Sequence, residues 1–64
     1  MDTTTGRKIR EARRRRNISQ VMLADALGTK QPYISALETG RLSCTVGQLR
    51  RIAWALHTTT AKLI

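Results

Sequence analysis

Few side chains in this sequence have the types and spacing that chemistry requires. The 64 residues include four Asp and Glu, one histidine, His57, and one cysteine, Cys44. They form no acid–base pair and no cluster with metal-ligand spacing. One cysteine cannot form an internal disulfide, and one Cys with one His is a poor ligand set for structural zinc. We therefore expect no enzymatic activity, metal, cofactor or small-molecule ligand.

Positive charge is the dominant chemical property of the chain. Twelve Lys and Arg stand against four Asp and Glu, which gives a net charge of +8. Such an excess favours a polyanionic partner, because each neutralised phosphate releases condensed counterions. RNA, anionic membrane and DNA all meet this condition. With one Tyr, one Trp and no Phe, the chain lacks the aromatic platforms of single-strand RNA binders.

The apolar pattern predicts that helices carry these side chains. A first helix is expected over residues 6–16, with Ile9 and Ala12 on one face. Thr4 or Thr5 would cap it, and the first five residues should fray. Asn17 suits a left-handed position after the helix end.

Two short helices are expected next. The first is capped by Ser19 and ended by Gly28, the residue type usual after a helix end. The next is entered by Lys30 or the residue before it, tolerates Pro32 in its first turn, and is stopped by Gly40. The apolar positions in both helices have helical spacing: Leu23, Ala24, Leu27, Ile34 and Leu37.

After a loop over residues 41–44, Thr45 is expected to cap a fourth helix. Thr58 and Thr59 interrupt it, and Thr59 can cap a last turn containing Leu63. An apolar stripe runs along the fourth helix: Val46, Leu49, Ile52, Ala53 and Leu56. Strand alternation is absent. The chain is therefore predicted to be a single all-α domain over residues 1–64, a compact bundle of four helices plus a short fifth.

Chain length and hydropathy indicate the expected oligomeric state and cellular location. A chain this short buries only about 60% of its unfolded surface, so dimerisation would help its stability. No apolar run approaches the roughly 20 residues of a membrane span, and no signal-peptide pattern opens the chain. We expect a cytoplasmic protein without a membrane partner.

Residues 19–40 have the pattern of a helix-turn-helix, two short helices joined by about three residues around a glycine. The turn makes the helices cross steeply, so that the second, over about residues 30–39, can lie in a major groove. Any small helical bundle has short turns, however. The pattern alone leaves the type of polyanion open.

At this point the sequence resembles the phage repressor and Cro (Xre-type) DNA-binding domains. The resemblance runs from Gly6 to Ile64 and includes I-R-E-A-R, S-Q-x-x-L-A-x-x-L-G, Q-P-Y-I-S-x-L-E-x-G-R and L-x-x-I-A-x-A-L in order. It implies a lambda-repressor-like bundle of five helices. It also implies that a symmetric dimer binds double-stranded DNA, as a bacterial or phage-encoded, nucleoid-associated regulator, and most simply as a repressor on a palindromic operator.

The resemblance also implies roles for individual residues. Gln20 matches a glutamine that touches a phosphate and braces a recognition-helix side chain, and Gln31 matches that side chain, which reads an adenine. Arg13 and Glu38 match a structural pair between the first and third helices. Thr39, Gly40 and Arg41 fall where the family lays backbone amides and a basic residue on phosphates.

Two sets of DNA-contacting residues are expected on this basis. The base-reading set is Gln31, Lys30, Tyr33, Pro32 and Ala36. The backbone set is Gln20, Ser19, Thr39, Arg41 and Arg16. Alternatives are solvent exposure for Gln31, a position at the core edge for Tyr33, and a solvated helix end for the arginine run. Arg14 and Arg15 should act mainly through long-range attraction.

The departures from the family concern the rest of the surface. Cys44 and His57 replace a common Pro and Gly; we expect a small loop residue and a helix cap, respectively. Val21, Met22 and Trp54 are apolar at positions that are usually polar or exposed. Trp54 is expected to be half-buried, with a dimer contact as the alternative. These three residues could also bind a partner protein, as antitoxins and phage accessory proteins of this fold do.

Overall fold

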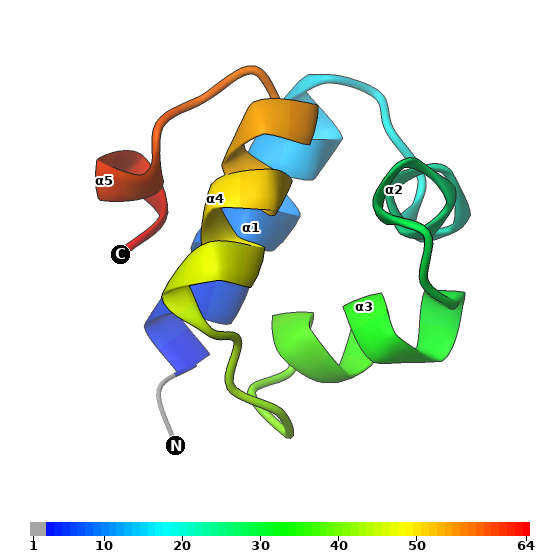
Figure 1. Cartoon of the computed structure of the whole chain (residues 1–64), viewed down its shortest axis with the longest axis horizontal. Coiled ribbons are helices and arrows are strands. Elements are labelled where there is room, and N and C mark those ends of the chain that lie inside the picture. Colours follow the sequence, from blue (N-terminus) through cyan, green and yellow to red (C-terminus); the bar gives the residue numbers. More distant parts are fainter. Residues whose placement is uncertain (1–2) are drawn as a thin grey trace.

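The computed structural model describes residues 3–64, and helices are the only regular elements in that range. They are α1 (Thr3–Arg15), α2 (Gln20–Leu27), α3 (Gln31–Glu38), α4 (Val46–Ala55) and the single-turn α5 (Thr60–Leu63) (Figure 1). Helix α3 packs against α2 and α1, while α5 packs against α4 and α1. The predicted all-α bundle of four helices and a short fifth is confirmed.

Helix α1 begins at Thr3, earlier than predicted. Thr4 and Thr5 lie inside the helix and do not cap it, so fraying of residues 3–5 was wrongly predicted; residues 1–2 lie outside the described range. Gly6 is buried where α1 meets the end of α3. A Cβ there would stand 2.3 Å from the Leu37 carbonyl oxygen and 2.8 Å from that of Glu38. Only glycine permits so close an approach of the two helices.

Caps at both ends mark the helix boundaries where the sequence predicts them. The hydroxyl oxygens of Ser19 and Thr45 accept the amides of Met22 (3.0 Å) and Gln48 (3.1 Å), and Thr59 accepts that of Lys62 (3.4 Å). Gly28 and Gly40 have left-handed φ of 69° and 79°. Asn17 and His57 share this conformation, with φ of 55° and 54°. The predicted roles of Asn17 and His57 at helix ends are confirmed.

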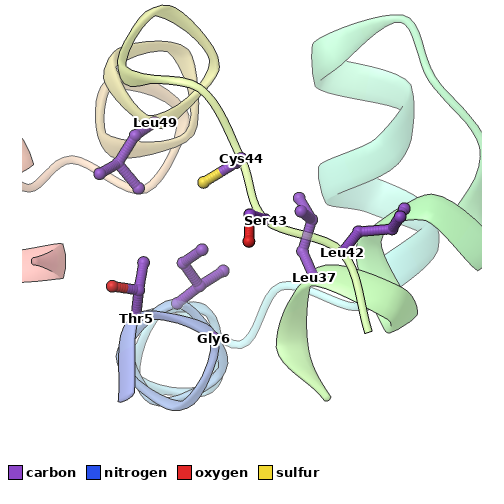
Figure 2. A pocket seen from close by; sticks show the side chains of 8 residues that line it. Thr5, Gly6, Leu37, Leu42, Ser43, Cys44 and Leu49 are labelled. Carbon is purple, nitrogen blue, oxygen red and sulfur yellow. The ribbon is translucent and has the colours of Figure 1, made fainter. Parts of the chain in front are cut away.

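A small hollow lies between the start of α1, the end of α3 and the loop leading to α4 (Figure 2). Its volume is about 160 Å³, and Ile9, Leu37 and Leu49 supply much of its wall. Cys44 lines it as a half-buried loop residue, and burial raises the pKa of the thiol. A raised pKa leaves less reactive thiolate, which fits the predicted small loop residue.

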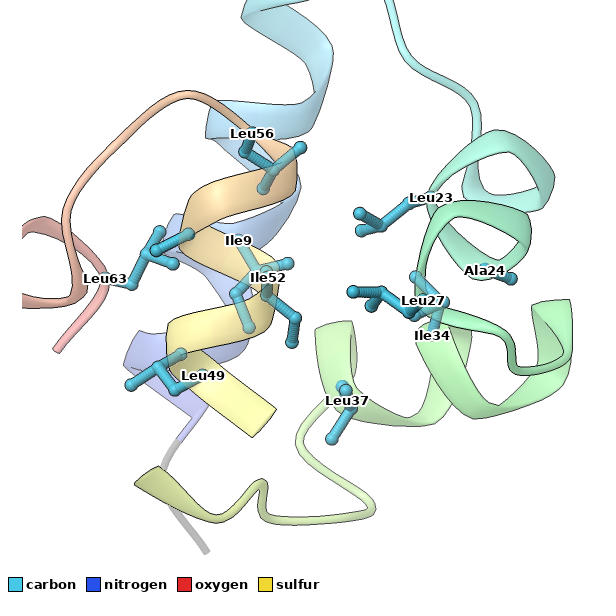
Figure 3. Close-up of a cluster of buried hydrophobic side chains, with 11 residues drawn as sticks. Ile9, Leu23, Ala24, Leu27, Ile34, Leu37, Leu49, Ile52, Leu56 and Leu63 are labelled. Carbon is cyan, nitrogen blue, oxygen red and sulfur yellow. The ribbon is translucent and has the colours of Figure 1, made fainter. Parts of the chain in front are cut away.

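One hydrophobic core joins all five helices (Figure 3). Its fully buried side chains are Ile9, Leu23, Ile34, Ile52, Leu56 and Leu63. Two predictions for α4 were wrong. Val46 is the first residue of the helix and is 64% exposed, so the apolar stripe starts only at Leu49. Trp54 is 81% exposed, not half-buried, because it projects from the face of α4 opposite Leu56 and Ile52.

No helix among residues 3–64 is long and apolar enough to cross a membrane.

Candidate nucleic-acid interface

Helices α2 and α3 form a helix-turn-helix. Three residues, Gly28 to Lys30, connect them, and Figure 1 shows α2 almost end-on while α3 lies across the view. The left-handed Gly28 turns the chain, and its amide satisfies carbonyls at the end of α2. Lys30 then precedes α3, with Pro32 in the first turn. The steep crossing leaves the start of α3 at the surface.

A buried ion pair fixes α3 to α1. The Arg13 guanidinium donates from Nε to Glu38 Oε2 (2.7 Å) and from Nη2 to Oε1 (3.0 Å). Its Nη1 donates to the Ile18 carbonyl at 2.8 Å, which ties the pair to the chain before α2. Arg13 is 8% exposed and Glu38 6%. The predicted structural pair therefore lies close together, buried and bidentate.

Two hydrogen bonds connect the ion pair to Gln20 and then to Gln31. Gln20 Nε2 donates to Glu38 Oε1 at 3.1 Å, and Gln31 Nε2 donates to Gln20 Oε1 at 2.7 Å. An ionised carboxylate only accepts hydrogen bonds, so Glu38 turns the amide nitrogen of Gln20 inward and its oxygen outward. Gln20 then fixes the amide of Gln31 in the same way. We call Arg13, Glu38, Gln20 and Gln31 the relay.

The outer end of the relay is suited to reading a base. Gln31 is exposed at the start of α3 and gives one N–H to Gln20. Within residues 3–64, no group pairs with its Oε1 or its second N–H. This leaves one acceptor and one donor in a fixed plane, the pattern that matches N6 and N7 of adenine in a major groove.

The other candidates for base reading do not all share this face. Lys30 and Pro32 are exposed beside Gln31. Tyr33 is half-buried and packs against the core, as in the alternative interpretation of this residue. Ala36 is only 9% exposed, and its carbonyl accepts the amides that follow α3, so the structure does not place it at the reading surface.

The backbone amides after α3 were expected to contact phosphates, but the structure shows them hydrogen-bonded within the protein. Those of Thr39, Gly40 and Arg41 donate to the carbonyls of Ser35, Leu37 and Ala36 at 3.0, 3.3 and 2.9 Å. They are therefore already paired and cannot serve a phosphate without breaking these bonds. The Thr39 hydroxyl likewise donates to Ser35 O at 3.0 Å. The Arg41 side chain is exposed and remains available to contact a phosphate.

The rest of the backbone set divides between two places. The Ser19 hydroxyl accepts the Met22 amide and keeps its own hydrogen to donate. Arg16 lies elsewhere, because its Nη2 donates to the His57 carbonyl at 3.1 Å, near the end of α4. Ser19 therefore stands with Gln20 at the start of α2, and Arg16 does not join them.

Two features were missed by reasoning from the sequence. The Gln20–Glu38 bond spans 18 residues, and no local pattern indicates it. Ser35, half-exposed four residues after Gln31, lies on the same face of α3, and that spacing was a usable signal. In the part of the chain that the structure describes, no three His, Cys, Asp or Glu residues come together as a metal site.

The sequence and the fold both have relatives among known proteins. A family model described as a helix-turn-helix domain matches residues 5–63. Among solved structures, the crystal structure of the restriction-modification controller protein C.AhdI from Aeromonas hydrophila is similar, with a TM-score of 0.90 and 26% identity. The similarity covers 98% of this chain and 93% of that chain. No curated protein matches the sequence.

Proposed function

The chain belongs to the helix-turn-helix domain family of DNA-binding transcription regulators, and from this premise we propose that it represses transcription as a homodimer on a palindromic operator. Helix α3 enters the major groove of each half-site, and Gln31 reads an adenine there. Lys30 and Pro32 contact neighbouring bases. Ser19, Gln20 and Arg41 hold the phosphates on either side.

The observation that carries this proposal is the relay. A carboxamide that rotates freely can present donor and acceptor either way round, so it discriminates poorly between bases. Gln31 is held by Gln20, which is held in turn by the buried Glu38. A reading group that is oriented before binding loses less conformational entropy when it pairs with a base.

Dimerisation is proposed because one short recognition helix covers few base pairs. Helix α3 has eight residues, so a single copy would find its site many times in a genome. Two copies on half-sites about 34 Å apart would double the sequence read. Sedimentation of the complex with a duplex carrying both half-sites tests this, and a single copy bound per duplex would contradict a symmetric dimer.

Binding-site selection tests the reading residue directly. Gln31→Ala should cost roughly 1–3 kcal/mol on the preferred operator and relax preference at one base pair per half-site. Gln20→Ala should weaken binding too, and the double variant should lose less than the sum, because both act as one unit. Gln48→Ala, a glutamine on α4, is the matched control.

The outcome that defeats the assignment is equally specific. If Gln31→Ala keeps the parental preference at every position, another residue reads the sequence, with Lys30 the first candidate.

Repression needs a separate test. The selected operator is placed across a promoter and transcription is measured in vitro. Parent protein should lower transcript yield and Gln31→Ala should not; a rise in yield would indicate activation.

A second candidate function, binding a partner protein, is favoured by the exposed Trp54. Met22 and Ala26 are four residues apart on α2, and Ala26 borders the same shallow hollow as Trp54. Val21 lies about 100° around α2 from Met22, so it belongs to another face. Trp54→Ser should abolish partner or subunit binding while leaving the fold intact; unchanged sedimentation and unchanged regulation in cells would exclude this role.

A further inference from the structure

Three exposed arginines lie along one face of α1 and take no part in the relay. Arg7, Arg10 and Arg14 follow the i, i+3, i+7 spacing that brings side chains to the same side of a helix. We call them the α1 stripe. Long-range attraction would act equally from any face of the protein, so the direction of this face decides what the stripe can do.

Contacts of the neighbouring residues fix that direction. Gly6 and Arg13 touch the end of α3. On the other flank, Lys8 Nζ donates to the Ile64 carbonyl, and Lys8 and Arg15 line a hollow with Lys62 of α5. With about 100° per residue, Arg10 lies about 60° beyond Arg13, on the side away from α5. Arg10 therefore lies on the flank of α1 nearest α3, while Arg14 and Arg7 lie about 100° and 120° from Arg13, farther round toward solvent.

Arg10 is the member of the stripe nearest the relay. Arg10 and Arg14 stand three residues before and one after Arg13, which connects through Glu38 to Gln20 and Gln31. The start of α2, where Ser19 and Gln20 are proposed to hold phosphates, is joined to Arg13 through Glu38.

The charge of the stripe is not compensated by the protein. Among residues 3–64, the ion pair found is Arg13–Glu38. Both carboxylate oxygens of Glu38 are bonded to Arg13, so Glu38 does not neutralise the stripe. Glu11 is within helical reach of Arg7 and Arg14, yet forms no ion pair with either. Three guanidinium groups thus face solvent with their hydrogen-bond donors available, and guanidinium is the side chain best suited to phosphate.

We propose that Arg7, Arg10 and Arg14 bind backbone phosphates of the operator outside the segment read by α3, so that α1 lengthens the footprint of each half-site. Seven residues of helix span about 10 Å, and a DNA strand carries one phosphate per roughly 3.4 Å of axis, so about three phosphates lie within reach. This inference rests on the proposed function, and it adds a binding site to the helix-turn-helix.

The test compares two triple variants of equal charge. Arg7→Gln, Arg10→Gln and Arg14→Gln together remove the stripe. The control carries Arg15→Gln, Arg50→Gln and Lys62→Gln, three exposed cations on other faces. Operator affinity is measured from 50 to 200 mM salt. Each lost phosphate contact lowers the slope of log K against log salt by about 0.9, so the stripe variant should lose up to about 2.7 per protomer.

Expected and contradicting results separate cleanly. The control should keep nearly the parental slope, and the stripe variant should keep the parental base preference. Phosphate-ethylation interference should lose its outermost positions only in the stripe variant. Equal slopes for the two triple variants would overturn the inference in favour of long-range attraction, leaving the proposed function standing. A parent protein that prefers no duplex sequence would instead defeat the proposed function. If the triple variant unfolds, Arg10→Gln alone should lower the slope by about 0.9.

Discussion

Replacing Gly6 with alanine is expected to destabilise the protein, although this substitution ordinarily favours a helix. Gly6 lies in α1, where exchange to alanine should contribute about 1 kcal/mol through helix propensity. Its added methyl group, however, would stand 2.3 Å from the Leu37 carbonyl oxygen and 2.8 Å from the Glu38 carbonyl oxygen. Both atoms belong to the backbone, so no side-chain rotation relieves the clash.

The size of the effect follows from these opposing terms. Overpacking a close contact typically costs 1–3 kcal/mol, and a clash with two carbonyls belongs at or above the upper end. After the propensity gain, a net loss of about 2 kcal/mol remains. For a domain of this size, that corresponds to a fall in Tm of roughly 8–16 °C. The relay should loosen as well, because Glu38 must move with its backbone.

Gly47→Ala is the matched control. Gly47 lies in the first turn of α4, and a Cβ there would meet only the Thr45 hydroxyl oxygen at 3.9 Å, an ordinary contact. This variant should therefore gain about 0.5–1 kcal/mol. Thermal melts followed by circular dichroism measure both variants. If Gly6→Ala melts at or above the parent, the close approach of α1 to α3 does not constrain the fold, and the reasoning fails.

Three further predictions concern single residues. Glu38→Ala should cost about 3 kcal/mol or more, because it strands the buried Arg13 cation, whereas Glu11→Ala on the exposed face of α1 should melt like the parent. His57→Gly should raise the free energy of unfolding by about 0.5–1 kcal/mol, since His57 holds a left-handed φ of 54°; a lower Tm would contradict this. Cys44 should react with iodoacetamide at pH 8 more slowly than a free cysteine, because burial raises the pKa of its thiol; equal rates would show that the thiol is not shielded.

The parts of the fold that were predictable are those set by local chemistry. A serine or threonine hydroxyl satisfies an amide three residues on, so Ser19, Thr45 and Thr59 mark helix starts wherever the chain lies. Asn17 and Gly28 mark left-handed ends for equally local reasons. The pairing of Arg13 with Glu38 spans 25 residues and was predicted only through the family resemblance.

The errors arose where contact between distant segments decides the outcome. The close approach of Gly6 to the end of α3 is one such contact, and the composition of residues 3–6 does not reveal it. Periodicity placed Val46 in the stripe of α4, but Val46 lies about 80° around the helix from Leu56 and about 120° from Ile52, at the exposed margin of the stripe. The burial of Ala36 depends on the loop that folds back onto its carbonyl.

The direction of hydrogen bonding in the relay limits how this surface could change its preferred base during evolution. Gln20 presents its oxygen to position 31, so any residue there must donate a hydrogen bond or leave that oxygen unpaired. Lysine or arginine meets the requirement and would shift preference towards guanine. Aspartate or glutamate, which suits cytosine, would place a second acceptor against the first. New specificities that depend on an acidic side chain at position 31 therefore require a change at Gln20 as well.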